Sequence, residues 1–442
     1  MKKIKNSFIV SIFFVSALCF SQKKWTLQEC VTYALENNIT IKKAENTLLT
    51  NDQDIIAAKG GFLPSVSGSA SHGISLGQSQ LFEGSFVNRT SNSTNFGVRV
   101  SENVFNGFRN TYLYKQSQLN LETSQLELNR IKDDISLNVA NSYLNVLFNK
   151  EQLETAKAQY DFSKKQLQQV NDLVDSGKQP RVNIYDAEAT LANDEQAVTI
   201  AQNNYTLSLL SLSQLLQVPF EGFDVSIIEV DSPSEALLYN DVTPILKYAL
   251  ENRNEIKIAE KNIENSELST KISKSGYLPS VNFGYSFGTN VFFTNLSTNE
   301  DAFFRQLEDN KGHSFNLSVN IPIFSQFQNK TAVAKSKVRE ENAKLDLDQA
   351  KLSLESNIQR AYTDAQAAFK TFEAAKKSLE SQKLSFENSQ ERFNIGAMNS
   401  FELEQSRIRY INAQSSLINA KYDFVFKTKV LDFYMGKRIT LD

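Results

Sequence analysis

The chain contains one sequence pattern twice, and this internal duplication constrains its fold more than any other feature. The run Tyr-Ala-Leu-Glu-Asn at 33–37 recurs at 248–252, and the run Leu-Pro-Ser-Val at 63–66 recurs at 278–281. Both pairs are separated by 215 positions. A chance similarity between helical segments explains such matches poorly, and the period is far longer than the roughly 20 to 50 residues of a solenoid repeat.

Further along the chain the separation between matching residues becomes 219, as it is between Gly177 and Gly396. A loop between the early and late matches therefore differs in length by four residues. We expect two repeats of one structural plan, at 22–241 and 242–442. In each repeat the sequence pattern predicts a helix, two strands, a very long helix and a returning helix.

The residue types needed for several kinds of chemistry are scarce. The sequence holds two cysteines and two histidines, which disfavours a disulfide scaffold and a cysteine- or histidine-ligated metal site. It shows no nucleophile–base pair and no phosphate-binding loop, and His72 and His313 fall near predicted strands. We therefore expect neither an enzyme nor a cofactor or metal site.

The N-terminus has the pattern of an export signal. Three lysines precede an apolar stretch at 8–20, which is followed by a small-x-small pattern that ends at Ser21. Residues 1–21 are predicted to be a signal peptide, and bulky Leu18 disfavours lipidation of Cys19. The mature chain would have a formal charge of 44 − 50 = −6, which gives no reason to expect nucleic-acid binding.

Two stretches of the chain favour long uninterrupted helices. Proline is absent from 104–179 and from 323–442, and both stretches show helical spacing of apolar residues. A helix from Gly107 to about 174 would be ~100 Å long. Gly177 and Gly396 are placed to end the two long helices in tight turns. At the start of the first repeat, Thr26 and Glu29 have the spacing of a capping box.

Four short segments show the period of two that is typical of strands. We place them at about 62–78, 94–105, 277–293 and 313–324, with polar loops at 79–92 and 294–311. A soluble antiparallel sheet gives the same alternation. Small Ser, Asn and Gly on the polar face, and aromatic residues gathered on the third strand, favour a transmembrane barrel.

Four strands are too few to close a barrel. A barrel in lipid needs about eight strands, because open edges leave unpaired amides. Several copies of the chain must then share strands, and physical reasoning alone permits two copies or three. The last helix carries two apolar stripes, which favours a neighbour on each side over a simple hairpin.

The order of these elements and motifs resembles the TolC-type outer-membrane efflux factors. The opening at 25–29 (Trp-Thr-Leu-Gln-Glu) is similar to the N-terminal signature of that family, although Ile39 stands where proline is usual. The two Gly-aromatic-Leu-Pro runs at 61–64 and 276–279 are similar to the family's entry into its strands. The resemblance covers nearly the whole mature chain.

The resemblance implies a homotrimer with a 12-stranded β-barrel in outer-membrane lipid and an α-helical barrel in the periplasm. It implies a passive exit duct in a tripartite efflux or secretion system. The expected partners are a periplasmic adaptor and an inner-membrane pump, and no nucleic acid.

The resemblance also implies a gate at the helix tips. Glu402 matches an acidic pore position of the family, and Gln405 stands where a second acid occurs. A ring of Glu402 would attract cations, but an ordinary carboxylate at a helix start is an equally good interpretation. Phe393 replaces a gate tyrosine and Met398 replaces an arginine, so apolar contacts are expected to hold the gate closed.

The first tip supplies further candidates. Asn183 and Asp186 are predicted to line the gate, together with the residues of the second tip. Adaptor docking is expected around Gly177 and Gly396, and Lys178 and Arg181 give the first tip a charge that the second lacks. The alternative to an exit duct is a periplasmic coiled-coil adaptor or scaffold without a barrel of its own.

Overall fold

The computed structural model describes residues 24–80, 84–226, 239, 241–297 and 299–437. The predicted signal peptide and Cys19 lie outside these residues. The chain divides into two compact units. The sheet unit comprises Ile39–Lys132 and Thr243–Ile358, and the tip unit comprises Met1–Asn38, Asp133–Val242 and Gln359–Asp442. No helix of the described chain is both long and apolar enough to cross a membrane.

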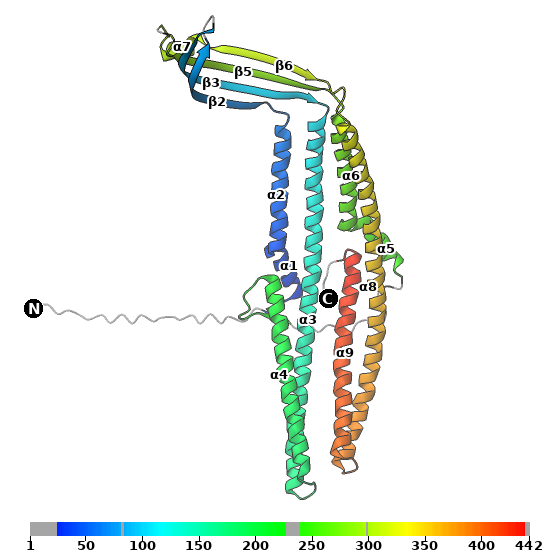
Figure 1. The fold of residues 1–442 in the computed structure, drawn as a ribbon. Coiled ribbons are helices and arrows are strands. Elements are labelled where there is room, and N and C mark those ends of the chain that lie inside the picture. Colours follow the sequence, from blue (N-terminus) through cyan, green and yellow to red (C-terminus); the bar gives the residue numbers. More distant parts are fainter. Residues whose placement is uncertain (1–23, 81–83, 227–238, 240, 298, 438–442) are drawn as a thin grey trace, which may run out of the picture. The chain divides into compact units, whose positions relative to one another are not determined.

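The two long helices are the largest elements (Figure 1). Helix α3 (Arg109–Asp175) and helix α8 (Gln328–Asn394) each contain 67 residues, which corresponds to about 100 Å. Each returns through a short turn into a 35-residue helix, α4 (Val182–Leu216) or α9 (Ser400–Tyr434). The predicted long helices and their glycine turns are therefore confirmed.

The opening helix of each repeat is divided in two. Helices α1 (Leu27–Asn37) and α2 (Ile39–Gly60) meet at Asn38, and α5 (Thr243–Asn252) and α6 (Asn254–Ser275) meet at Arg253. Both junction residues have extended backbone angles, which interrupt a helix. The predicted capping box is present at the start of α1, where Thr26 and Glu29 each bind the other's backbone N–H.

In the sheet unit, four strands form an antiparallel sheet in the order β2-β3-β5-β6. The strands are β2 (Ser65–Gln80), β3 (Phe86–Asn106), β5 (Ser280–Thr294) and β6 (Gly312–Asn320). The duplicated residues have duplicated roles here. The Asn110 side chain donates to the Gly61 carbonyl, as the matching Asn329 side chain does to Gly276.

The strand boundaries differ from the predicted ones in two places. The expected loop at 79–92 is wrong, because β2 and β3 pair as far as Gln80 and Phe86. Residues 88–95 of the hairpin are all polar, so hydrophobic alternation gives no signal there. The last strand ends at Asn320 rather than near 324. Pro322 follows two residues later, and a proline has no N–H for a strand ladder.

The register of the sheet separates its two faces. One row across the four strands joins Val66, Val100, Tyr285 and Phe315, whereas the next row joins Ser67, Arg99, Ser286 and Ser314. The first face is apolar. The second is polar, and apart from Arg99 its side chains in this row are small. The apolar face is exposed in the single chain, where Val66 and Phe315 are 68% and 72% exposed.

The tip unit is held together by contacts between helices of both repeats. Helix α9 has a neighbour on each side, as its two apolar stripes predict. Phe424 contacts Phe369 and Phe372 of α8, while Tyr422 contacts Phe148 of α3. At one end of this unit the short strands β1 (Lys24–Trp25) and β4 (Asp224–Val225) pair in parallel.

Candidate functional site at the helix tips

The two hairpin tips have the same backbone structure. Gly177 and Gly396 both have positive φ, at 71° and 76°, and both occupy the C′ position of a Schellman motif. In the first tip the N–H groups of Gly177 and Lys178 donate to Val174 and Leu173. In the second tip the N–H groups of Gly396 and Ala397 donate in the same way to Phe393 and Arg392. The duplication therefore extends to the turns.

The side chains of the two tips differ. Lys178 and Arg181 in the first tip correspond to Ala397 and Ser400 in the second, at the separation of 219. Both basic residues are exposed. In the second tip the most exposed apolar residues are Ile395 and Phe401, which are 80% and 71% exposed. The first tip therefore carries two exposed basic residues at positions where the second carries Ala397 and Ser400.

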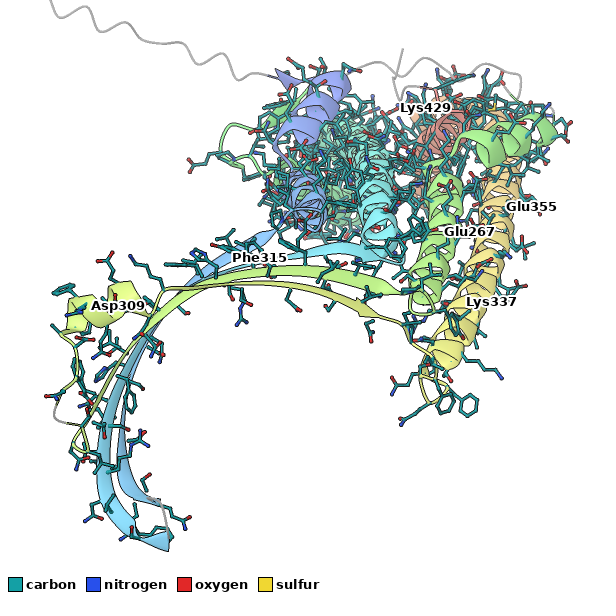
Figure 2. The ribbon with its side chains drawn as sticks, turned by 90° about the horizontal axis from the view of Figure 1, so that it is seen from above. Glu267, Asp309, Phe315, Lys337, Glu355 and Lys429 are labelled. Atoms are coloured by element: carbon teal, nitrogen blue, oxygen red, sulfur yellow. The ribbon has the colours of Figure 1, made fainter. Side chains whose placement is uncertain are left out.

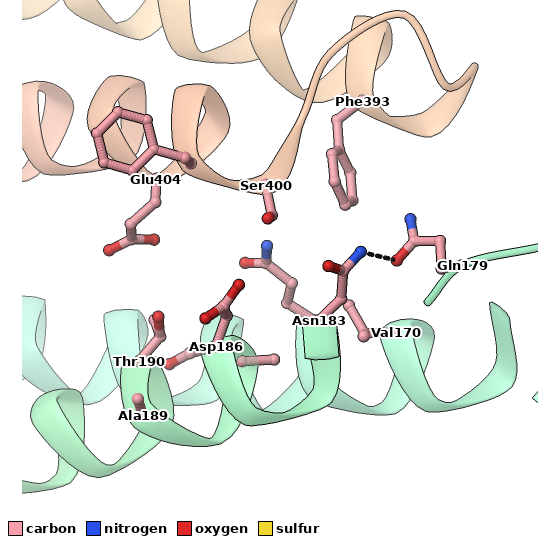
Figure 3. Close-up of a pocket in the computed structure, with 13 residues that line it drawn as sticks. Val170, Gln179, Asn183, Asp186, Ala189, Thr190, Phe393, Ser400 and Glu404 are labelled. Atoms are coloured by element: carbon pink, nitrogen blue, oxygen red, sulfur yellow. Dashed lines mark hydrogen bonds between the residues drawn. The ribbon is translucent and has the colours of Figure 1, made fainter. Parts of the chain in front are cut away.

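A cavity of about 240 Å³ lies between the first and second hairpins, close to the tips (Figure 3). Helix α4 contributes Asn183 and Asp186, and helix α9 contributes Ser400 and Glu404. Asn183 Nδ2 donates to Gln179 Oε1 at 3.1 Å, within the first tip. The structure thus brings the predicted residues Asn183 and Asp186 together with the second tip.

Phe393 and Met398 are placed in an apolar cluster beside this cavity. Phe393 is 6% exposed and packs with Phe386 and Leu403, and Met398 lies against the same cluster. Phe386 also stacks on Tyr410 of α9, with ring centroids 5.5 Å apart. Both candidate gate residues are therefore packed apolar side chains.

Glu402 and Gln405 lie apart from this cluster, on the exposed side of α9. Glu402 is in the first turn of the helix, and its backbone N–H donates to Oδ1 of the capping residue Asn399 at 2.8 Å. The described residues that line the cavity include Glu404 but neither Glu402 nor Gln405.

A buried ion pair behind the cavity was not predicted from the sequence. Arg407 of α9 is 3% exposed and Asp194 of α4 is 8% exposed. Arg407 Nη1 lies 2.8 Å from Asp194 Oδ2, and Arg407 Nε lies 2.8 Å from Glu404 Oε2. Asp194 Oδ2 also accepts from Ser163 Oγ of α3 at 2.5 Å.

These contacts determine the charge state of Arg407. Burial disfavours the charged guanidinium, but hydrogen bonds to Glu404 and Asp194 outweigh it and raise the pKa of Arg407 above its ordinary value. Helices α3, α4 and α9 are therefore joined by a charged group at one point. An arginine and an aspartate 213 positions apart give no periodic signal, which is why sequence reasoning missed them.

The fold with its long helical hairpins and open antiparallel sheet can be compared with known proteins. The family model described as "Outer membrane efflux protein" matches residues 31–217 and 245–437, one stretch in each repeat. The chain therefore belongs to the outer membrane efflux protein family. No match was found among curated proteins.

Solved structures of such channels have the same fold. CusC is 16% identical, with a TM-score of 0.78 over 93% of this chain and 92% of that one. VceC from Vibrio cholerae is 15% identical, with a TM-score of 0.76 over 93% and 97% of the two chains. The open state of MtrE from Neisseria gonorrhoeae is 18% identical, with a TM-score of 0.76 over 94% and 90%.

Membership of this family decides between the two functions that the sequence left open. The protein is an exit duct of a tripartite efflux system rather than a periplasmic adaptor or scaffold. It has the mixed helical and antiparallel fold of these solved channels, and its family is one of the outer membrane. The family is one of channels, not of enzymes.

Proposed function

We propose that three copies of this chain form one continuous duct, with four strands from each copy making 3 × 4 = 12 strands. The observation that carries this proposal is the open sheet. Strands β2 and β6 stand at its edges, each with one neighbour among the described strands. In lipid these edges would leave a row of unpaired backbone groups, each of which costs several kcal/mol. Pairing β6 of one copy with β2 of the next removes both edges.

The two faces of the sheet suit such a barrel. The apolar face, which carries Tyr285 and Phe315, faces lipid, and the face with Ser286 and Ser314 lines the water-filled interior. Serine, asparagine and glycine dominate this interior face, on which Arg99 is a charged residue. Such a lining provides water contact without a strong binding site for any one solute.

The periplasmic end of the duct is proposed to be the gate. The candidate pore residues are Glu402, Gln405, Asn183 and Asp186. Packing of Phe393 and Met398 in the apolar cluster supports a closed state held by side-chain burial rather than by a tyrosine hydroxyl or a salt link. A threefold ring of Glu402 would then act on ions at the narrowest point.

The tips are proposed to bind the helical hairpins of a periplasmic adaptor, which connects the duct to an inner-membrane pump. The turns at Gly177 and Gly396 offer two grooves of the same backbone geometry. Lys178 and Arg181 are exposed in one tip only, so acidic residues of an adaptor would distinguish the two grooves.

Crosslinking to the adaptor in intact cells tests this docking model. Reversing both charges, with Lys178→Glu and Arg181→Glu, should weaken adaptor crosslinking at the first tip several-fold. The matched controls Ala397→Glu and Ser400→Glu add acid to the second tip without removing a basic partner, so they should weaken crosslinking less. Undiminished crosslinking of the Lys178 and Arg181 variant would reject this docking model.

A further inference from the structure

Strand β5 is longer than its hairpin partner β6. Strand β5 has 15 residues and β6 has nine, and their pairing ends where Gly288 meets Gly312. The last six residues of β5 therefore extend beyond β6. On the edge of β5 that pairs with β6, the backbone groups of residues 289–294 have no strand partner among the described residues.

Side chains of the following segment bind these backbone groups instead. We call Glu300–Lys311 the α7 segment, after its short helix α7 (Phe303–Asp309). Asn310 Nδ2 donates to the Asn290 carbonyl at 2.7 Å. Gln306 Oε1 accepts from the N–H of Phe292 at 2.8 Å, and Glu300 Oε1 accepts from that of Thr294 at 2.6 Å.

Asn290, Phe292 and Thr294 are every second residue of β5, so their backbone groups point to the same edge of the strand. The α7 segment thus covers the edge that β6 leaves open. A covered edge cannot pair with a further strand. Strand pairing between copies is therefore limited on this side to the length of β6.

The α7 segment also lies against the apolar face of the sheet. Thr289 Oγ1 donates to the Leu307 carbonyl at 2.7 Å, and Val291 is 1% exposed. Thr289 and Val291 have the same parity as Tyr285 and Phe287, so they belong to the lipid-facing side of β5. In Figure 2 the helix that carries Asp309 lies on the convex side of the curved sheet.

The outer side of α7 combines an exposed aromatic ring with paired charges. Phe304 is 81% exposed and contacts Phe303 edge to face, with ring centroids 5.5 Å apart. Arg305 Nε lies 3.6 Å from Asp301 and 3.6 Å from Asp309. Phenylalanine is among the residues that form the apolar face of helices lying at a membrane surface.

We propose that the α7 segment is a lipid contact at the rim of the barrel, where Phe304 enters the boundary between headgroups and acyl chains. The argument is continuity with the lipid-facing face. Along β5 the apolar residues of that face continue past Phe287 to Val291 and Phe293, near the end of the strand, where the α7 segment binds it. The segment therefore stands where the apolar band meets water. This inference rests on the outer-membrane location of the sheet.

Single-cysteine probes in the purified, vesicle-reconstituted oligomer test this inference. Cys30 is fully buried and is replaced by serine. Phe304→Cys, Glu308→Cys and Phe315→Cys are each labelled with a polarity-sensitive fluorophore. Quenching is compared between lipids with a nitroxide near the headgroup and lipids with a nitroxide deep in the acyl chain. Glu308 is the matched control, because its side chain is 76% exposed on the same helix.

The probe at position 304 should be quenched several-fold more by the shallow nitroxide than the probe at 308. The probe at 315, in the middle of the apolar face, should be quenched best by the deep nitroxide. Equal quenching at 304 and 308 overturns the lipid contact, as does a disulfide between 304 and a cysteine at Leu76 of a second copy. Absence of quenching at 315 would instead show that the sheet is not in the membrane.

Discussion

Arg407 of α9 and Asp194 of α4 form a buried ion pair that joins the two repeats, with 2.8 Å between Nη1 and Oδ2. The duplication does not repeat it. At the separation of 219, Asp194 corresponds to Ala413 and Arg407 corresponds to Glu188. The pair thus occurs once in a chain whose turns and long helices occur twice. The pair holds α9 against α4. The residues of the two tip turns take no part in it.

Removing one member of this pair should destabilise the tip unit strongly. Arg407→Met leaves Asp194 buried with Ser163 as its remaining described partner, and breaking a buried pair in this way costs about 3–5 kcal/mol. The double variant Asp194→Leu, Arg407→Met removes both charges and should recover most of the loss. Thermal unfolding of the detergent-purified oligomer measures both effects.

Arg409→Met is the matched control, because Arg409 is exposed on the same helix. It should change the midpoint little. Equal midpoints for Arg407→Met and Arg409→Met would show that the buried pair contributes nothing to stability.

Glu402→Gln should reduce the block of the channel by multivalent cations. Three carboxylates at one level attract such ions strongly, and the amide removes that charge without changing the shape. Gln405→Glu should do the opposite, because it adds a second acidic ring on the same side of α9. Single-channel recordings in planar bilayers give block and conductance for each variant.

Glu391→Gln is the control, since Glu391 is exposed on α8. Unchanged conductance and block in Glu402→Gln would remove Glu402 from the gate. The residue would then be an ordinary carboxylate at a helix start, favoured by the helix dipole.

Alanine at either tip glycine should loosen its turn by a similar amount. Gly177 and Gly396 have left-handed backbone angles, which cost a residue with a Cβ about 1–2 kcal/mol. A Cβ at either position meets no atom within 4 Å, so the cost is conformational. Hydrogen exchange of the tip amides should become faster in both variants.

Gly60→Ala separates this effect from a general effect of alanine. A Cβ at Gly60 also meets nothing within 4 Å, but Gly60 ends α2 without a positive φ. Exchange near Gly60 should therefore stay the same or slow down. A tip variant that exchanges no faster than the unchanged protein would contradict the role given to its glycine.

Tyr143→Phe should lower the stability of the protein at neutral pH. It should also make the further loss of stability at alkaline pH smaller. Tyr143 is fully buried, and its hydroxyl donates to the carbonyls of Trp25 and Ser226. Burial, followed by nearby negative charge, raises the pKa of Tyr143 well above its ordinary value. Removing the hydroxyl leaves two acceptors without this donor, which costs about 1–3 kcal/mol.

The sign of the pH effect follows from the direction of the shift. Folding favours the neutral phenol, so the contribution is complete below the unfolded pKa of about 10 and is lost as pH rises through the folded pKa. Unfolding midpoints should therefore fall more steeply above pH 10 in the unchanged protein than in Tyr143→Phe. Parallel pH curves for the two proteins would contradict this account.

Much of the fold was predictable because it depends on local patterns. The capping box at Thr26, the long proline-free helices and the turns at Gly177 and Gly396 each follow from residues close in sequence. The two apolar stripes of the last helix also predicted neighbours on both sides, which Phe424 and Tyr422 confirm.

The remaining features depend on contacts between distant residues. The pairing of Gln80 with Phe86 extends the hairpin beyond the polar run at 88–95, which has no hydrophobic alternation. Helix α7 has seven residues in a segment rich in charge, and its binding to β5 depends on the short length of β6. Nothing in the local sequence distinguishes the buried Arg407 from the exposed Arg409 two residues later. The burial of Arg407 depends on the packing of α4 against α9 in the folded chain.

The mass of the protein extracted from outer membranes tests the central claim most directly. Native mass spectrometry in detergent should give the mass of three chains, because the open four-stranded sheet must share strands with further copies and the proposed barrel has twelve strands. Heating in denaturing detergent should convert that species to single chains. A single chain that stays in solution without detergent would contradict the account of this protein as an outer-membrane duct.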